Sequence, residues 1–247
     1  MDVASQVNRF GQPVGEAIDG WGGAVAPSPV VLSGRFCRLE PLDAARHSDA
    51  LFQANAACAD DRDWTYLPYG PFGDAGEYRQ WVAKVSVLPD PLFFAIVDVR
   101  DEHRAVGVAS FLRIAVDAGS VEVGHIKFSP LLQARPAATE AMYLLMRHAF
   151  TLGFRRYEWK CDALNAASRR AAERLGFVYE GLFRRATVVK GRNRDTAWYS
   201  VVDTEWPRLE TAFKAWLAED NFATSGDQLR RLEALRGGQD ERGTALD

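Results

Sequence analysis

The stretch from Val121 to Phe177 decides the fold, because it alternates strands and helices around one loop of small residues. In order it contains VEVGHIKF (121–128), SPLLQARPAAT (129–139), a long apolar-spaced segment (137–152), YEWKC (157–161) and NAASRRAAERLGF (165–177). Short β-rich runs predict strands in the first and fourth of these segments. The spacing of apolar residues predicts helices over 137–152 and 166–175. We therefore expect a β-loop-α-β-α unit.

The segments on either side extend this unit into a larger sheet. Upstream, the patterns predict a strand (30–42), helices (44–59 and 74–88) and strands (91–99 and 105–116) that lead into 121–128. Downstream they predict strands (177–189 and 196–202) around a turn (190–195), then helices (207–221 and 228–235). Asp43 and Asn165 suit N-caps, and Gly176 suits a helix end. A three-strand antiparallel meander that leads into the β-loop-α-β-α unit predicts an α+β fold. Its central sheet should be mixed, mostly antiparallel and flanked by helices.

The two ends of the chain differ in composition from its middle. Residues 1–29 are rich in glycine and proline and predict an extended arm, held to the body by Phe10 and Trp21. Residues 30–203 form the predicted domain and 204–236 its C-terminal helices. The last stretch, 237–247, lacks an apolar face and predicts a disordered tail.

Composition excludes several classes of protein. The 247 residues include 30 basic and 33 acidic side chains, a net charge of -3 that argues against a nucleic-acid binder. The densest apolar run, LFFAIV (92–97), is far shorter than a membrane span. The three cysteines form no CxxC motif, and the four histidines show no ligand spacing, so we expect neither a disulfide scaffold nor a metal site. A cytoplasmic location follows as the expectation.

The loop before the long helix has the form of an anion site. Where a strand end runs into a helix N-terminus, unpaired amides and the positive end of the helix dipole point outward. A pyrophosphate can accept hydrogen bonds from these amides. The candidate amides belong to Gln133, Ala134, Arg135, Ala137, Ala138 and Thr139. Small side chains at 137 and 138 let a ligand approach the backbone.

These motifs resemble the GNAT superfamily of N-acetyltransferases, most closely its RimJ/RimL-like branch, over roughly residues 30–203. That superfamily has an acetyl-CoA loop of Gln or Arg, two residues, Gly, one residue, then Gly or Ala. This chain reads Gln133-Ala-Arg-Pro136-Ala-Ala138, with a proline that has no N–H at the glycine position. The branch also carries Asn-x-x-Ser before a short helix ending in Gly-Phe, matched by Asn165, Ser168 and Gly176-Phe177.

The resemblance implies acetyl-CoA as co-substrate and assigns roles to single residues. Asn165 corresponds to the residue that binds the pantetheine arm and Ser168 to a hydroxyl near the thioester sulfur. Arg169 is a candidate for the adenosine 3′-phosphate. Ala172 stands where many members have a tyrosine acid.

Direct attack of an amine on the thioester needs a hydrogen-bond donor and a base. A backbone N–H near Ile126 to Phe128, at the splayed strand end, would stabilise the oxyanion. Glu122 is the first candidate for the base, since the family often uses a glutamate on this strand. His125 is the second, being the histidine close to the inferred site.

Each candidate also has a purely structural interpretation. Glu122 could pair with Arg113 on the neighbouring strand, and His125 could fill space. Asn165 and Ser168 suit a helix start, and Cys161 suits the core. The aromatic loop 64–72 could border the acceptor groove or pack into the core.

A basic cluster over 184–194 also allows two interpretations, a solvated hairpin or a surface for an acidic acceptor or partner. The cluster comprises Arg184, Arg185, Lys190, Arg192 and Arg194.

The sequence thus predicts an acetyl-CoA-dependent N-acetyltransferase acting on a primary amine, either a protein N-terminus or a small molecule. An acyl-CoA-binding module without transfer is the alternative, motivated by Pro136 and Ala172. A nucleic-acid or ribosome-associated protein using the 184–194 hairpin is a third hypothesis, which the net charge argues against. No membrane partner is expected, and the sequence leaves open whether the chain is a monomer or a homodimer.

Overall fold

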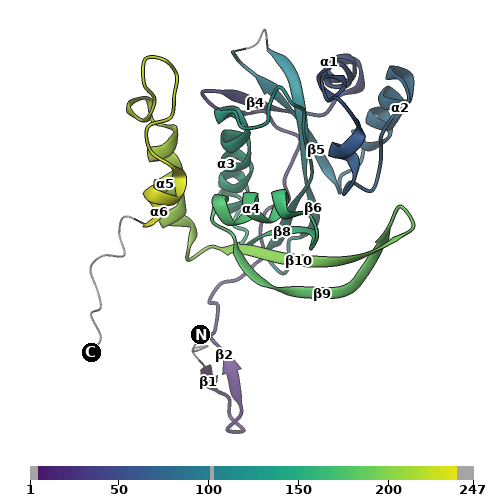
Figure 1. Cartoon of the computed structure of the whole chain (residues 1–247). Coiled ribbons are helices and arrows are strands. Elements are labelled where there is room, and N and C mark those ends of the chain that lie inside the picture. The colour runs from purple at the N-terminus through teal and green to yellow at the C-terminus, as the bar shows by residue number, and fades with distance from the viewer. Residues whose placement is uncertain (1–4, 101–102, 238–247) are drawn as a thin grey trace.

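The computed structural model describes residues 5–100 and 103–237, whose centre is an eight-stranded sheet. Figure 1 shows the sheet running between two groups of helices. The strand order is β3-β4-β5-β6-β7-β8-β10-β9, antiparallel except for the parallel pair β7 and β8. Its strands are β3 (Leu32–Ser33), β4 (Cys37–Pro41), β5 (Leu92–Asp98), β6 (Arg104–Ala115), β7 (Ser120–Phe128), β8 (Arg156–Asp162), β9 (Val178–Val189) and β10 (Arg192–Val202). The predicted α+β class and mixed sheet are confirmed.

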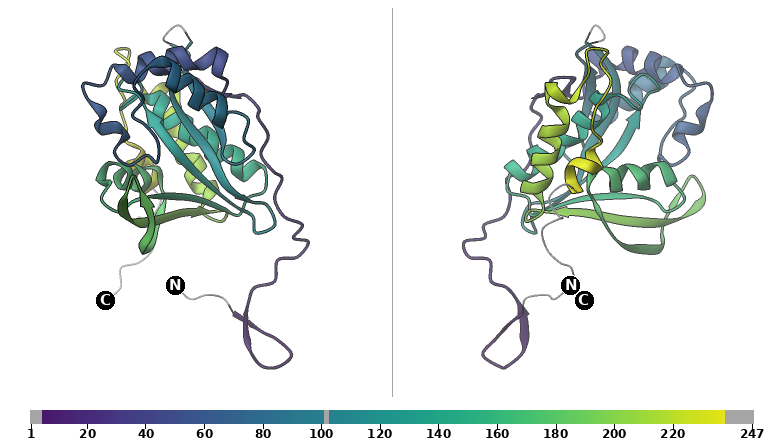
Figure 2. Two further views of the ribbon diagram at one scale, coloured as in Figure 1. Left: turned by 90° about the vertical axis from the view of Figure 1, so that its right-hand side faces the viewer. Right: turned by 60° about the vertical axis from the view of Figure 1, so that its left-hand side comes forward.

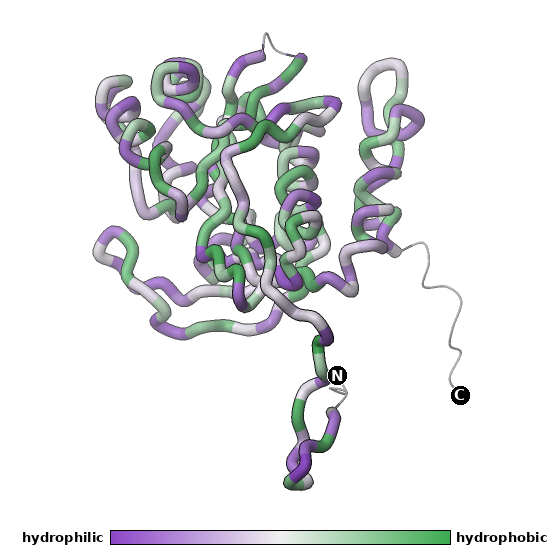
Figure 3. The backbone as a smooth tube through the Cα atoms, turned by 180° about the vertical axis from the view of Figure 1, so that it is seen from behind, coloured by the Kyte–Doolittle hydropathy of each residue, from purple (hydrophilic) through white to green (hydrophobic). Residues whose placement is uncertain are grey.

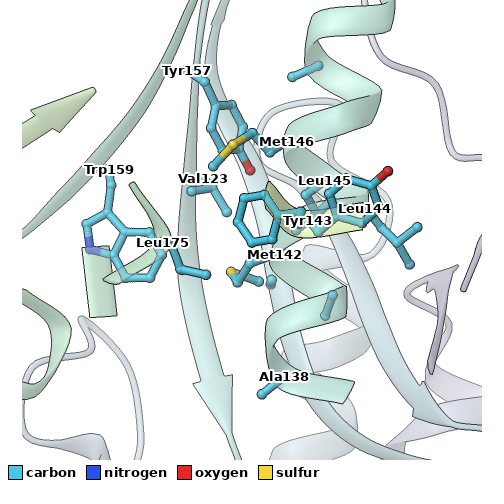
Figure 4. Close-up of a cluster of buried hydrophobic side chains, with 14 of the residues drawn as sticks. Val123, Ala138, Met142, Tyr143, Leu144, Leu145, Met146, Tyr157, Trp159 and Leu175 are labelled. Carbon is cyan, nitrogen blue, oxygen red and sulfur yellow. The ribbon is translucent and has the colours of Figure 1, made fainter. Parts of the chain in front are cut away.

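Helices cover both faces of the sheet. On one face lie α3 (Pro136–Thr151), α4 (Ala166–Leu175), α5 (Trp206–Leu217) and α6 (Leu232–Gly237), and on the other α1 (Ala44–Ala56) and α2 (Ala75–Val85) (Figure 2). The larger core packs around α3, where Figure 4 shows Val123 and Tyr157 gathered against the Met142–Met146 stretch. Because α5 contributes Phe213 and Trp216 to this core, the C-terminal helices are an integral part of the fold.

Local signals for helix ends are confirmed. Asp43 caps α1 by accepting from the amide of Arg46, and Asn165 caps α4 by accepting from the amide of Ser168 at 3.1 Å. Gly176 ends α4 with a φ of 99°, a conformation that favours glycine. Pro136 occupies the first turn of α3, where its missing N–H breaks no hydrogen bond.

The predicted strand 30–42 is wrong as one element, because the structure breaks it into β3 and β4. The carboxylate of Glu140, on α3, accepts hydrogen bonds from the backbone amides of Arg35, Phe36 and Cys37 at 2.7, 2.6 and 2.8 Å. At the break a side chain therefore satisfies backbone donors that a neighbouring strand would otherwise satisfy.

Three further boundaries differ from the prediction. β10 begins at Arg192, since Lys190 and Gly191 adopt φ of 49° and 74° and form a two-residue turn. The helix α5 ends at Leu217, because Ala218 is extended, and the last helix starts at Leu232.

The N-terminal arm leaves the body as a small hairpin of β1 (Ser5–Val7) and β2 (Pro13–Gly15). Figures 1 and 3 show it projecting from the domain. Trp21 anchors the arm, since its indole N–H donates to the carbonyl of Asp117 at 2.9 Å. The expected contact of Phe10 with the body is wrong, because Phe10 lies in the hairpin and is 70% exposed. The predicted tail lies outside the described residues, apart from Gly237 at the end of α6.

None of the helices in the described part of the chain is long and apolar enough to cross a membrane.

Candidate active site

The two parallel strands at the centre of the sheet separate after a short paired stretch. Residues Ser120–Val123 of β7 pair with Arg156–Trp159 of β8, and the ladder ends there. A bulge in β7 causes the separation: Gly124 faces Ser110 and Lys127 faces Val108 of β6, leaving an extra residue between them. His125, in the bulge, has a φ of 51°. A cleft therefore opens between the diverging ends of β7 and β8.

Segments far apart in sequence enclose this cleft, which has a volume of about 750 Å³. One wall is the segment after the short helix η1 (Asp61–Trp64), and the other is the β9–β10 hairpin. The two meet, since the Lys190 ammonium donates to the carbonyl of Trp64 at 2.7 Å. The aromatic loop divides between core and cleft: Trp64 is buried in the smaller core, and Tyr66 lines the cleft.

Glu122 lines the cleft from β7 with only 4% of its surface exposed. Its Oε2 accepts from Arg113 Nη1 at 2.5 Å and from Lys160 Nζ at 3.0 Å, so the pairing with Arg113 is confirmed. Oε1 lies on the side of Gly124, another cleft residue. Glu122 is thus a buried carboxylate with one oxygen held by cations and the other turned toward the bulge.

The cation Lys160 connects Glu122 to a second carboxylate. Its ammonium lies 2.7 Å from Glu158 and 3.7 Å from the centre of the Trp198 ring. Glu158 also pairs with Arg156 at 2.6 Å, but it does not line the cleft. Two buried glutamates of one ion-pair network therefore differ in their access to a ligand.

His125 stacks in an aromatic cluster at the bulge. Its ring centre lies 5.6 Å from that of Tyr69 and 5.1 Å from that of Phe93. Burial, and then the nearby charges of Arg113 and Arg194, lowers the pKa of His125 to about 4. Its Nδ1 is buried and has no partner within the described residues. The imidazole is therefore neutral at pH 7.

This burial predicts a loss of stability in acid. The unfolded chain protonates His125 near pH 6.5, whereas the folded chain does so near pH 4, so stability falls as the pH drops through that window. Between pH 7 and pH 5 the wild type should lose about 2 kcal/mol more than His125→Phe. Urea unfolding at both pH values measures the difference. Equal losses of stability in the two proteins would contradict the lowered pKa of His125.

The start of α4 presents polar groups to the cleft. Trp159 Nε1 donates to the Ser168 hydroxyl at 3.0 Å, so that hydroxyl keeps its own proton to donate. Asn165 and Cys161 line the cleft beside Ser168. Burial raises the pKa of the Cys161 thiol, which fits the predicted core role. Ala172 is fully buried.

Only part of the predicted amide set remains free to bind an anion. The amides of Gln133, Arg135 and Ala138 donate to carbonyls of Ser129, Leu132 and Arg135 at 3.0, 3.2 and 3.1 Å. Within the described residues, the amides of Ala134 and Ala137 donate to no backbone carbonyl, whereas Thr139 is the fourth residue of α3, where amides join the hydrogen bonds of the helix. Ala134 has a φ of 58°, which turns the chain into the helix. The loop therefore offers a small anion site at the N-terminus of α3.

The remaining predicted cofactor residues divide into two groups. Ile126, Phe128 and Gln133 line the cleft. The Gln133 side chain donates to Asp63 Oδ2 and to the carbonyl of Phe128, both at 3.0 Å. Arg169 does not line the cleft; its Nε donates to the Tyr199 hydroxyl at 3.1 Å.

The sequence analysis missed Lys127, a buried cation in the cleft wall. Its ammonium lies 3.3 Å from Asp63 and 4.9 Å from the centre of the Trp64 ring, and its side chain is 4% exposed. The available signal was a charged residue inside a β-rich run. Its partners could not be found from the sequence, because they lie on a loop more than sixty residues away.

Over residues 5–100 and 103–237, no three His, Cys, Asp or Glu side chains gather in a way that could hold a metal ion.

Comparison with known proteins agrees with this geometry. Residues 37–178 match the model of an acetyltransferase (GNAT) domain. The chain belongs to the GNAT acetyltransferase family. The family membership supports an acetyltransferase enzyme.

Solved GNAT structures resemble most of the chain. A GCN5-related N-acetyltransferase from Brucella melitensis is 45% identical, with a TM-score of 0.86 over 89% of this chain and 99% of its own. A probable GNAT acetyltransferase from Chromobacterium violaceum is 41% identical, with a TM-score of 0.74 over 79% and 98%. RimL, a ribosomal L7/L12 α-N-protein acetyltransferase, shares the fold at 22% identity, with a TM-score of 0.60 over 73% and 99%. The GNAT match ends at Val178, so the β9–β10 hairpin lies almost wholly beyond it.

Proposed function

We propose that this GNAT enzyme transfers the acetyl group of acetyl-CoA to the primary amine of a protein N-terminus or a small molecule by direct attack. The observation that carries the proposal is the cleft between the diverging β7 and β8, with a buried carboxylate in its wall. Holding the amine and the thioester in line in such a cleft can supply several kcal/mol of the barrier reduction. The cysteine pattern supports a cytoplasmic enzyme.

In this proposal each end of acetyl-CoA has a candidate site. The free amides of Ala134 and Ala137 at the α3 N-terminus suit the pyrophosphate, and the small side chains of Ala137 and Ala138 leave the backbone accessible. Asn165 and Ser168, in the cleft lining, suit the pantetheine and thioester end. Arg169 stays the candidate for the 3′-phosphate, with its Nε bound to the Tyr199 hydroxyl and its side chain outside the cleft lining.

Three groups of the chain divide the chemistry. Backbone amides on the unpaired edge of β7, near Ile126 to Phe128, can donate to the thioester carbonyl oxygen. Glu122 takes the proton of the attacking ammonium, directly or through water, with Oε1 as the acceptor. Ser168, whose hydroxyl oxygen is held by Trp159, donates its proton toward the leaving sulfur. We assign this role to Ser168 because Ala172, at the position of the tyrosine acid of many members, cannot donate a proton.

His125 remains the alternative base, but burial lowers the pKa of its imidazole to about 4. An imidazole with a pKa of about 4 is neutral at pH 7 but is a weak base. If His125 were the base, the pH–rate profile of acetyl transfer would show no transition near pH 6.5. We therefore place His125 in the wall of the acceptor groove.

A thiol-release assay with acetyl-CoA and a panel of amines tests the proposed function. Acetyl transfer to at least one amine, shown by the mass of the product, supports it. Acetyl-CoA binding without transfer to any of the amines, unchanged by Glu122→Gln, would favour the binding module.

Asn165 allows the cofactor site to be tested apart from the fold. Asn165→Asp keeps the side-chain oxygen that caps α4 but loses the amide donor, whereas Asn165→Ala loses both. Both variants should bind CoA about tenfold more weakly by calorimetry, as expected when one ligand hydrogen bond is lost. Only the alanine variant should also lose about 1 kcal/mol of stability. Wild-type CoA affinity in the aspartate variant would remove Asn165 from the cofactor site.

A further inference from the structure

The β9–β10 hairpin divides its basic residues into two sets. Arg184, Arg185 and Arg192 are exposed, whereas Arg194 is half-buried and lines the cleft. A bulge in β9 produces this difference: Arg194 pairs with Thr187, but Thr196 pairs with Phe183, so β9 has extra residues between the two pairs. Arg185, in the bulge, has a φ of 51°, and its amide donates to Asp195 Oδ1 at 2.7 Å. The hairpin bends at this point and carries Arg194 into the cleft.

Arg194 differs from the other cations of the cleft because it has no carboxylate partner. Arg113 and Lys160 pair with Glu122, and Lys127 pairs with Asp63. Within the described residues, no ion pair or side-chain hydrogen bond of Arg194 is found, and its Nε is buried without a partner. A buried guanidinium N–H without an acceptor is unfavourable, so its retention in a cleft indicates a ligand that supplies one.

The position of Arg194 places that ligand at the acceptor end. Arg194 acts electrostatically on both His125, in the β7 bulge, and Cys161, beside Ser168. The free amides for the cofactor pyrophosphate belong instead to the loop and helix start over 134–137, which do not line this cleft. The guanidinium therefore lies beside the reacting centre and apart from the site proposed for the CoA phosphates.

We propose that the acceptor is an amine that also carries a carboxylate, such as an amino acid or a peptide with an acidic side chain, and that Arg194 binds this carboxylate. A planar guanidinium with a free Nε–H can form two parallel hydrogen bonds to a carboxylate. A monoanion suits the site better than a phosphate dianion, because the cleft lining has a single positive charge in excess. Its four cations are Arg113, Lys127, Lys160 and Arg194, and its three carboxylates are Asp63, Glu122 and Asp162. This inference rests on the acetyltransferase function proposed above.

Amines offered in matched pairs test the inference. The pairs are β-alanine and β-alaninamide, glutamate and glutamine, and tetrapeptides with Asp or Asn at the second position; phosphoethanolamine is the phosphate probe. Thiol release gives kcat/KM for each. In the best pair, the wild type should prefer the carboxylate about tenfold or more, the effect of one charge-assisted hydrogen bond pair. Phosphoethanolamine should be a poorer acceptor than the carboxylate amine.

Two arginine variants on one strand provide the control. Arg194→Met should reduce the carboxylate preference to about twofold or less by raising KM for the acid, with an unchanged thermal shift by acetyl-CoA. Arg192→Met, an exposed residue two positions away, should keep the preference.

The outcomes separate this inference from the proposed function. Transfer with equal kcat/KM for acid and amide in every pair would overturn the role of Arg194 but leave the acetyltransferase intact. An equal loss for both members of a pair in Arg194→Met would do the same. A lower acetyl-CoA affinity in that variant would move Arg194 to the cofactor site. Transfer to none of the amines would count against the proposed function itself.

Discussion

Replacing Glu122 by glutamine should lower kcat/KM for acetyl transfer by about 100-fold or more. Glutamine has the same shape but cannot take a proton from the attacking ammonium, and a positioned base typically contributes at least this factor. Because the contacts proposed for acetyl-CoA are made at the starts of α3 and α4, the affinity for acetyl-CoA should change little. The loss should shrink at high pH, where more of the amine is already deprotonated. Steady-state kinetics from pH 6 to pH 10 measures both effects.

Glu158→Gln is the matched control for this variant. Glu158 is buried like Glu122 and shares Lys160 with it, at 2.7 Å against 3.0 Å, but it lies outside the cleft lining. Both variants remove one carboxylate from the same network, so they should lose similar stability. Only Glu122→Gln should lose most of its activity. If the two variants lose activity equally, Glu122 contributes through the ion-pair network and is not the base.

Replacing Glu140 by alanine should cause the largest loss of stability, about 4 kcal/mol. Glu140 is 3% exposed, and its carboxylate accepts hydrogen bonds from the backbone amides of Arg35, Phe36 and Cys37. Alanine leaves these donors without an acceptor and opens space beside Gly34, where the carboxylate now lies. For a chain of this size the melting temperature should fall by about 10 °C. Calorimetry measures the change.

Glu210→Ala provides the comparison for the stability measurement. Glu210 forms an exposed pair with Lys214 one turn away at 2.9 Å, an interaction that contributes well under 1 kcal/mol. Its melting temperature should therefore stay within about 2 °C of the wild type. If Glu140→Ala is too unstable to purify, Glu140→Gln still tests the contribution of these hydrogen bonds. The NH₂ group of glutamine cannot accept a hydrogen bond from a backbone amide. A wild-type melting temperature in either Glu140 variant would show that the three hydrogen bonds contribute little.

The order of elements could be predicted because it depends on local signals. The alternation in β7, the apolar spacing in α3 and the cap at Asn165 are each encoded within one or two turns of chain. The break between β3 and β4 could not be predicted in this way. It depends on Glu140, more than a hundred residues away in the chain, reaching the amides of Arg35 to Cys37.

The candidate site was predicted only in its outline. Glu122, Asn165 and Ser168 were found because motif and strand position indicate them, and the structure brings all three to one cleft. Arg169 was also proposed, and Tyr199 of β10 holds its guanidinium outside the cleft lining. Its helix position was predicted correctly, whereas the direction of its side chain depends on a strand that follows it by thirty residues.

By itself, the sequence determined the α+β class, the mixed character of the sheet and the order of its main elements. Tertiary structure decided which charges are paired and which are free. Arg113 and Lys160 meet Glu122, while Arg194, one of five similar basic residues in the sequence, enters the cleft without a partner. The physical reason lies in two bulges, at His125 and Arg185, which depend on how neighbouring strands pair and leave no periodic pattern in the sequence.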